Sequence, residues 1–163
     1  MSLPKNQPTA RFALTHPIHL LAFGFGAGLS PVFPGTLGTL VAVPLYLLLQ
    51  PLPLTIYLCV TGVLLIGGIW ICGYTSRALA IHDYKGIVWD ELVGYLITMM
   101  MAPQGWLWVV AGFFIFRFFD ILKPWPVGWI DHHIKGGAGI MMDDALAAFY
   151  SFVVLQLLVF WFK

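Results

Sequence analysis

The acidic residues of this sequence concentrate in three short motifs, and carboxylates are the side chains that bind hard metal ions and act as general bases. The motifs are IVWDELVG (87–94), FRFFDILKP (116–124) and GIMMDDALA (139–147). Their five acids are Asp90, Glu91, Asp120, Asp143 and Asp144. Because the motifs are far apart in the chain, we expect three different helices to bring these carboxylates to one reaction centre.

Acids at the start of a helix also have a simpler explanation, since they cap free N–H groups and suit the helix dipole. The pair Asp90 and Glu91 is expected to open one helix, and Asp143 and Asp144 are expected at the head of the last one. Capping does not explain Asp120, which is expected near the C-terminus of its helix, where the dipole disfavours negative charge. Asp120 therefore needs a partner, either a basic residue or a metal cation.

A divalent cation such as Mg²⁺ fits this set, because it binds carboxylate oxygens and keeps several waters. The candidate ligands are Asp90, Glu91, Asp120 and Asp143. Adjacent residues on a helix point about 100° apart, so we expect one acid of each pair to reach the ion directly. The general base is Glu91 or Asp144, so that all five acids are candidate catalytic residues and the roles within each pair stay open.

Basic and hydroxyl side chains close to these motifs fit an anionic phosphate group. Arg117 offers a planar pair of donors and Lys123 a point charge, and both lie three residues from Asp120 on one helix face. The loop LSPVFPGTLGTL (29–40) adds the hydroxyls of Ser30 and Thr36 and the free N–H groups of the helix that follows. We predict that these four residues bind phosphate.

The composition indicates which elements position these groups. The chain has 163 residues, of which 60% are hydrophobic and 9% are charged, and its mean hydropathy is +0.90. Soluble domains have about 25% charged residues, and disordered chains need low hydrophobicity, so both classes are excluded. A net charge of +1 gives no basic patch for nucleic acid. We predict a single all-α integral membrane domain over residues 1–163.

Five apolar runs are the candidate membrane spans. They cover residues 36–49, 54–74, 92–102, 105–119 and 145–162. The second and the last are long enough to cross a bilayer as they stand, which takes about 20 residues. We expect a polytopic helical bundle of five spans, or alternatively four spans and a re-entrant segment. Residues 18–34 are interrupted by glycine and proline, which predicts a helix followed by an irregular loop.

The distribution of charge predicts the orientation. If the N-terminus is inside, the inside segments 1–35, 75–91 and 117–144 hold seven of the eight Lys and Arg residues. Positive residues favour the cytoplasmic side, so we expect the N-terminus in the cytoplasm and the C-terminus outside. All seven Asp and Glu residues fall in the same segments. The candidate site is therefore expected to face the cytoplasm.

The motifs together resemble the phosphatidylglycerophosphatase A family. The resemblance is carried, in order and over nearly the whole chain, by LSPVFPGTLGTL (29–40), IVWDELVG (87–94), FRFFDILKPWPVGWID (116–131) and KGGAGIMMDDALA (135–147). It implies a Mg²⁺-dependent phosphatase of the bacterial inner membrane that converts phosphatidylglycerophosphate into phosphatidylglycerol in phospholipid biosynthesis. The family's acidic and basic positions fall on Asp90, Glu91, Asp120, Asp143, Asp144, Arg117 and Lys123.

Other phosphatase machinery is absent from the sequence, which contains no DxDxT, no PSGH motif and no cysteine followed by a phosphate loop. This absence favours attack by water assisted by a metal ion, and a covalent aspartyl-phosphate stays an open alternative. Two functions of other classes are a small membrane transporter for cations or metals and a non-catalytic lipid-binding subunit. The transporter requires acids at the middle of the spans, and the subunit does not require clustered acids.

Overall fold

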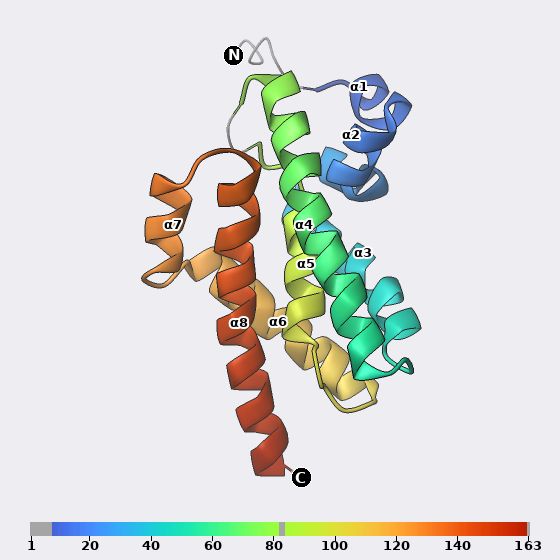
Figure 1. Ribbon diagram of the computed structural model, residues 1–163, viewed down its shortest axis with the longest axis vertical. Coiled ribbons are helices and arrows are strands. Elements are labelled where there is room, and N and C mark those ends of the chain that lie inside the picture. Colours follow the sequence, from blue (N-terminus) through green and yellow to red (C-terminus); the bar gives the residue numbers. More distant parts are fainter. Residues whose placement is uncertain (1–7, 82–83, 163) are drawn as a thin grey trace.

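The computed structural model describes residues 8–81 and 84–162, and every regular element in these two ranges is a helix, in agreement with the predicted all-α class (Figure 1). The elements are α1 (Ala10–Thr15), α2 (Pro17–Ala22), η1 (Gly24–Leu29), α3 (Pro34–Leu49), α4 (Leu54–Leu79), α5 (Trp89–Thr98), α6 (Trp106–Leu122), α7 (Val127–His133) and α8 (Gly136–Phe162). Lys5, Asp83 and Lys163, which contribute to the predicted orientation, lie outside the described residues.

Two helices, α4 and α8, are long and apolar enough to cross a membrane. They have 26 and 27 residues, and at about 1.5 Å per residue each is longer than the hydrocarbon core of about 30 Å. They run along the long axis of the molecule in opposite directions (Figure 1). Helix α3 is a shorter apolar helix of 16 residues. The total of five spans is not confirmed and stays a prediction.

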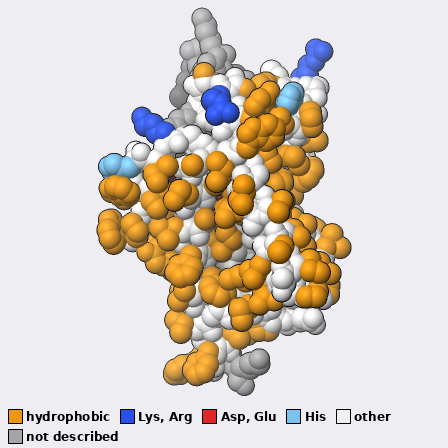
Figure 2. All heavy atoms as spheres, viewed as in Figure 1, with side chains coloured by type: hydrophobic (Ala, Val, Ile, Leu, Met, Phe, Trp, Pro, Cys, Tyr) orange, Lys and Arg blue, Asp and Glu red, His pale blue; other side chains and the backbone are white. Residues whose placement is uncertain are grey.

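The outer surface of the long helices is apolar. Ile66 on α4, Phe114 on α6 and Leu157 on α8 are 71%, 66% and 63% exposed. In Figure 2 hydrophobic side chains cover most of the visible face, and the basic and histidine side chains lie towards the upper end. A surface of this kind is stable against lipid and would be an aggregation site in water.

The last helix begins earlier than the sequence predicted. Helix α8 begins at Gly136, about two turns before Asp143 and Asp144, so the expectation that these two acids head the helix is wrong. Gly137 and Gly139, close to this start, lie directly against the backbone at Ile69 and Ile134. Dipole capping therefore does not explain this acidic pair.

The irregular stretch predicted at residues 18–34 is present. Helix α2 is followed by the 3-10 segment η1, in which Phe25 and Gly26 have φ values of 57° and 103°. Phe33, with φ 52°, precedes the first residue of α3, which is Pro34 rather than the expected Thr36. Proline suits this position because it has no N–H to leave unpaired and its φ is already helical.

Helix α5 is the central element of the bundle and packs against α3, α4, α6 and α8. Its neighbours hold it through tyrosine hydroxyls as well as apolar contacts. Tyr57 of α4 donates a hydrogen bond of 2.5 Å to the carbonyl oxygen of Leu96, and Tyr95 of α5 donates one of 3.0 Å to that of Val109 in α6. These bonds fix both the depth and the rotation of a helix that is only 10 residues long.

Helices α4 and α8 approach at Gly137. A Cβ atom at this position would overlap the carbonyl oxygen of Ile69 and would lie 2.6 Å from the backbone nitrogen of Gly73. Small residues that let two helix backbones touch are the usual packing device of membrane helices. The contact sets the distance between the helix that carries Asp143 and Asp144 and the rest of the bundle.

We predict that Gly137→Ala lowers the free energy of unfolding by about 1–3 kcal/mol, the usual cost of forcing an extra group into a packed interior. The measurement is thermal unfolding of the purified protein in detergent. The matched control is Gly67→Ala on α4, since a Cβ at Gly67 meets no atom within 4 Å. The control is expected to be neutral or slightly stabilising because alanine favours helix. Equal apparent Tm values for the two variants would contradict this account of the α4–α8 contact.

Candidate functional site

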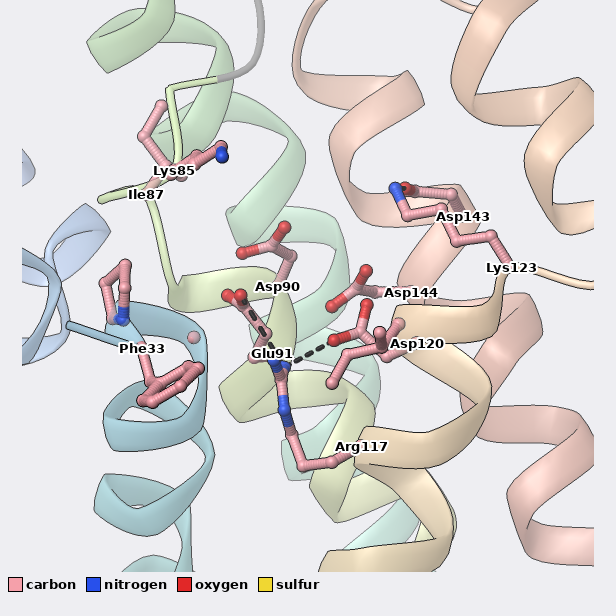
Figure 3. A pocket seen from close by; sticks show the side chains of 13 residues that line it. Phe33, Lys85, Ile87, Asp90, Glu91, Arg117, Asp120, Lys123, Asp143 and Asp144 are labelled. Carbon is pink, nitrogen blue, oxygen red and sulfur yellow. Dashed lines mark hydrogen bonds and ion pairs between the residues drawn. The ribbon is translucent and has the colours of Figure 1, made fainter.

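One pocket of about 350 Å³ gathers the acidic motifs of the sequence (Figure 3). Its walls come from the start of α3, the loop before α5, the first turn of α5, the end of α6 and the second turn of α8. The lining residues are Phe33, Pro34, Gly35, Lys85, Ile87, Asp90, Glu91, Arg117, Asp120, Ile121, Lys123, Asp143 and Asp144. The structure thus brings together all five predicted acids and both predicted basic residues.

Helix α5 contributes Asp90 and Glu91 from its first turn, as the sequence predicted. The helix begins after Val88, whose backbone N–H donates a hydrogen bond of 2.8 Å to the carbonyl oxygen of Ala22. This bond attaches the start of α5 to α2. The acids thus lie at the helix end where the partial charge of the helix dipole is positive.

Arg117 lies between two of the carboxylates. Its Nη1 donates a short hydrogen bond to Oδ2 of Asp120, one turn further along α6, and lies 3.9 Å from Oε1 of Glu91 on α5. The dashed lines in Figure 3 mark both contacts. The partner that the sequence required for Asp120 is therefore Arg117. The guanidinium of Arg117 thus links α5 and α6 electrostatically at the floor of the pocket.

Lys123 joins α6 to α8. It follows the last residue of α6 in a left-handed conformation, with φ 43°. Its Nζ donates a hydrogen bond of 2.6 Å to Oδ2 of Asp143 and lies 3.1 Å from Oδ1 of Asp131 on α7. Burial alone lowers the pKa of Lys123, but the hydrogen bonds and charges of Asp143 and Asp131 outweigh it and raise the pKa above its usual value. Lys123 therefore remains a cation at any physiological pH.

The start of α3 forms the third wall, at Gly35. A Cβ atom here would overlap Oε1 of Glu91 and would lie 3.1 Å from Nη1 of Arg117. The helix start thus reaches the pocket as the sequence predicted, but the two hydroxyls predicted with it do not line the pocket. The hydroxyl of Ser30 donates instead to the carbonyl oxygen of Val32, at 2.8 Å. Thr36 does not line the pocket, whereas Phe33, Pro34 and Gly35 just before it do.

Three of the carboxylates are grouped as a cation site would require. Oxygens of Asp90, Glu91 and Asp144 all lie within 4.8 Å of one another. Within the described part of the chain, one buried oxygen of each has no hydrogen-bond partner, and the same is true of Asp143 Oδ1. Buried carboxylate oxygens without partners are costly unless a cation compensates them, so the donor set fits a hard divalent ion.

The grouping differs from the predicted ligand set in two respects. Asp144 takes the place predicted for Asp120 and Asp143, because these two are engaged by Arg117 and Lys123. Asp90 and Glu91 both contribute an oxygen, although one acid of each pair was expected to do so. The longer side chain of Glu91 compensates for the different direction in which it leaves the helix.

Sequence reasoning overlooked two residues that form the pocket. Gly35 belongs to a Pro-Gly-Thr sequence that is common at turns, so its close approach to Glu91 and Arg117 is visible only in three dimensions. Lys85 entered the sequence argument as a positive charge that sets orientation, whereas it lines the pocket mouth. In the sequence, only the position of Lys85 five residues before Asp90 indicates a role in the pocket.

The fold and this pocket define a helical, membrane-associated protein whose acidic site has the groups to hold a cation and an anion together. A family model described as phosphatidylglycerophosphatase A matches residues 20–159. Phosphatidylglycerophosphatase A of Escherichia coli is 44% identical over 156 residues, which cover 94% of this chain and 91% of the relative. The Haemophilus influenzae protein of the same name is 42% identical over 161 residues, with 98% and 99% covered. No solved structure matches this chain.

The chain therefore belongs to the phosphatidylglycerophosphatase A family. The resemblance stated from the sequence motifs is confirmed. The match extends over all four motifs that carry it, including the acids and the two basic residues of the pocket.

Proposed function

We propose that this protein hydrolyses the terminal phosphate monoester of phosphatidylglycerophosphate and releases phosphatidylglycerol and inorganic phosphate. The observation that carries the proposal is the meeting of five carboxylates with Arg117 and Lys123 in one pocket of a member of this family. The two relatives bear the name of this activity over nearly their whole lengths. A transporter or a non-catalytic lipid-binding subunit has no comparable support.

Mg²⁺ is the proposed cofactor, held by Asp90, Glu91 and Asp144. Support comes from the grouping of their oxygens within 4.8 Å and from the buried oxygens that lack partners among the described residues. When bound, such an ion draws negative charge from a phosphoryl oxygen and lowers the pKa of a water molecule. Mg²⁺ prefers oxygen ligands and keeps several waters, and these carboxylates would supply such ligands.

The remaining polar groups bind the phosphate and move a proton. Arg117 and Lys123 hold the phosphate oxygens, and Asp120 positions the guanidinium of Arg117. In place of Glu91 or Asp144, the bases considered from the sequence, we propose Asp143 as the base, because Lys123 fixes its Oδ2 while its Oδ1 has no partner in the described chain. Water attacks phosphorus and transfers its proton to Asp143. The bond from phosphorus to the glycerol oxygen breaks, and that oxygen takes a proton from solvent.

The proposed topology has the N-terminus in the cytoplasm, the C-terminus outside and the pocket facing the cytoplasm of the inner membrane. In Figure 1, α3, α4, α5, α6 and α8 follow one another in alternating directions along the long axis, as five crossings require. Helix α5 has 10 residues and rises only about 15 Å, roughly half of the hydrocarbon core. Residues 99–105 complete this crossing, and the surrounding helices shield it from lipid.

The proposed activity predicts release of inorganic phosphate when the protein, purified in detergent, is given phosphatidylglycerophosphate and Mg²⁺. Phosphate is measured colorimetrically, and EDTA is expected to abolish the release. Asp120→Ala, purified in the same way, is the inactive control, because it leaves Arg117 without its main partner. If no combination of metal and substrate gives release above this control, the protein is not the proposed phosphatase.

The metal site predicts a binding defect that is independent of turnover. Asp144→Asn removes one negative ligand and is expected to weaken Mg²⁺ binding at least about tenfold, measured by titration calorimetry. Asp131→Asn is the matched control, since Asp131 contacts Lys123 and lies outside the three-carboxylate group. The control is expected to bind Mg²⁺ within about twofold of the wild type. Equal losses in the two variants would show that overall charge, not ligation, governs binding.

The topology predicts the side of the membrane on which a reporter fused after residue 163 is active. In cells we expect alkaline phosphatase, which requires export, to be active at this position and a cytoplasmic fluorescent reporter to be dark. The matched fusion at residue 135, between α7 and α8, should give the reverse pattern. A C-terminal fusion that reports from the cytoplasm contradicts the odd number of crossings.

A further inference from the structure

Lys85 differs from the other cations of the pocket because, among the residues that the structure describes, no carboxylate engages it. Arg117 is bound to Asp120, and Lys123 to Asp143 and Asp131. Lys85 lines the same pocket with an exposed side chain, and within residues 8–81 and 84–162 it has no ion pair. In Figure 3 Lys85 and Lys123 lie on opposite sides of the carboxylates. Lys85 is thus a cation at the mouth with its charge available.

The backbone that carries Lys85 is held firmly although its side chain is exposed. Gly86, the next residue, packs against Gly28 of η1 so closely that a Cβ on Gly86 would lie 2.6 Å from the Gly28 carbonyl oxygen. Two residues further on, the N–H of Val88 donates its 2.8 Å hydrogen bond to Ala22. Because the loop is anchored, the backbone of Lys85 has a fixed position. This favours binding of a ligand by the side chain at a defined place.

The size of the pocket indicates which part of a lipid it can hold. Its volume of about 350 Å³ is at the lower end of the range of about 300–1,000 Å³ for small-molecule sites. A polar headgroup fits such a volume, whereas acyl chains remain in the bilayer. The headgroup of the proposed substrate has two phosphates, the terminal monoester and the phosphodiester that joins the glycerol to the lipid. With the monoester at Arg117 and Lys123, the phosphodiester lies at the mouth.

The charges of the pocket require a cation at that mouth. The lining includes five acidic side chains and three basic ones, of which Lys85 is one. A phosphodiester anion placed beside these carboxylates is repelled unless a cation faces it, because at short range the interaction between charges amounts to several kcal/mol. Arg117 and Lys123 are engaged, and the monoester competes for them. Lys85 remains as the partner for the second phosphate.

We propose that Lys85 binds the phosphodiester group of the lipid headgroup and thereby selects lipids that carry a second phosphate one glycerol away from the first. The inference rests on the proposed function and assigns it a specificity-determining residue. A lipid with a terminal phosphate alone, such as phosphatidate, lacks the group that Lys85 binds. Phosphatidylglycerol, the product, retains that group and lacks the monoester.

The experiment separates the two phosphates by using fragments of the substrate. KM and kcat are measured for phosphatidylglycerophosphate in detergent micelles, and calorimetry gives the Kd of dihexanoyl phosphatidylglycerol and of inorganic phosphate. The variants are Lys85→Gln, Lys85→Arg and Lys135→Gln. Lys135 is the matched control, because it is an exposed lysine between α7 and α8 that does not line the pocket.

For Lys85→Gln we expect KM and the Kd of phosphatidylglycerol to rise about tenfold, the effect of losing one charge-assisted hydrogen bond. The Kd of inorganic phosphate and kcat should change much less, and Lys85→Arg should restore most of the affinity. Lys135→Gln should match the wild type throughout. This pattern distinguishes contact with the phosphodiester from attraction of anions to a basic surface, which both lysine-to-glutamine changes would weaken alike.

Three results overturn the proposal: no change in Lys85→Gln, equal weakening of inorganic phosphate and phosphatidylglycerol, or equal effects of Lys85→Gln and Lys135→Gln. The second result would assign Lys85 to the monoester, and the third to general surface charge. Failure of the proposed function has a different signature, since the wild type then releases no phosphate. The calorimetric comparison of phosphatidylglycerol with inorganic phosphate tests Lys85 in that case as well.

Discussion

Mutual repulsion among five carboxylates in a pocket walled by apolar helices is the constraint to which the rest of this structure responds. Asp90, Asp120, Asp143 and Asp144 are buried, and in a medium of low dielectric constant like charges at such distances strongly disfavour one another. Arg117 and Lys123 relieve part of this repulsion by binding one carboxylate each at short range. The group formed by Asp90, Glu91 and Asp144 keeps an excess of negative charge, which accounts for its suitability for a divalent cation.

Bringing these acids together requires helix backbones to come unusually close. At Gly35 the start of α3 touches Glu91 and Arg117, and at Gly94 a Cβ would lie 2.5 Å from the ring of Phe116. Gly137 performs the same task between α4 and α8. The contacts at Gly94 and Gly137 involve no charge, yet each sets a distance between helices that carry charges. The acidic centre therefore depends on a few glycines, which let the helices approach closely, as much as on the charged side chains themselves.

The part of the site that could be predicted is the part that depends on local geometry. Arg117, Asp120 and Lys123 share a helix face because of their three-residue spacing, and Asp90 and Glu91 open a helix that hydropathy alone reveals. The start of α8 could not be found in this way, because its glycines read as a loop until the backbone of α4 is known to lie against them. Asp144 belongs to the three-carboxylate group because Arg117 and Lys123 engage other acids. Which acids they engage depends on how the helices pack, and the sequence alone does not show this.

The failures over Ser30, Thr36 and Lys85 have a common cause. Each depends on the direction in which a residue in or next to an irregular segment points, and hydropathy or motif spacing contains no information on this. Ser30 uses its hydroxyl within its own turn, and Lys85 reaches the pocket because of the contact between Gly28 and Gly86. Fold class and the identity of the acids were therefore accessible from composition and motifs, whereas the rim of the pocket was not.

The ion pairs of Arg117 and Lys123 have a consequence for how any phosphate group enters this pocket. Both the guanidinium of Arg117 and the ammonium of Lys123 already hold a carboxylate, so an incoming phosphate competes with Asp120 and Asp143 for these two cations. The free energy of binding is then the difference between two interactions of similar kind, which keeps affinity for the phosphate itself modest and lets the released phosphate depart.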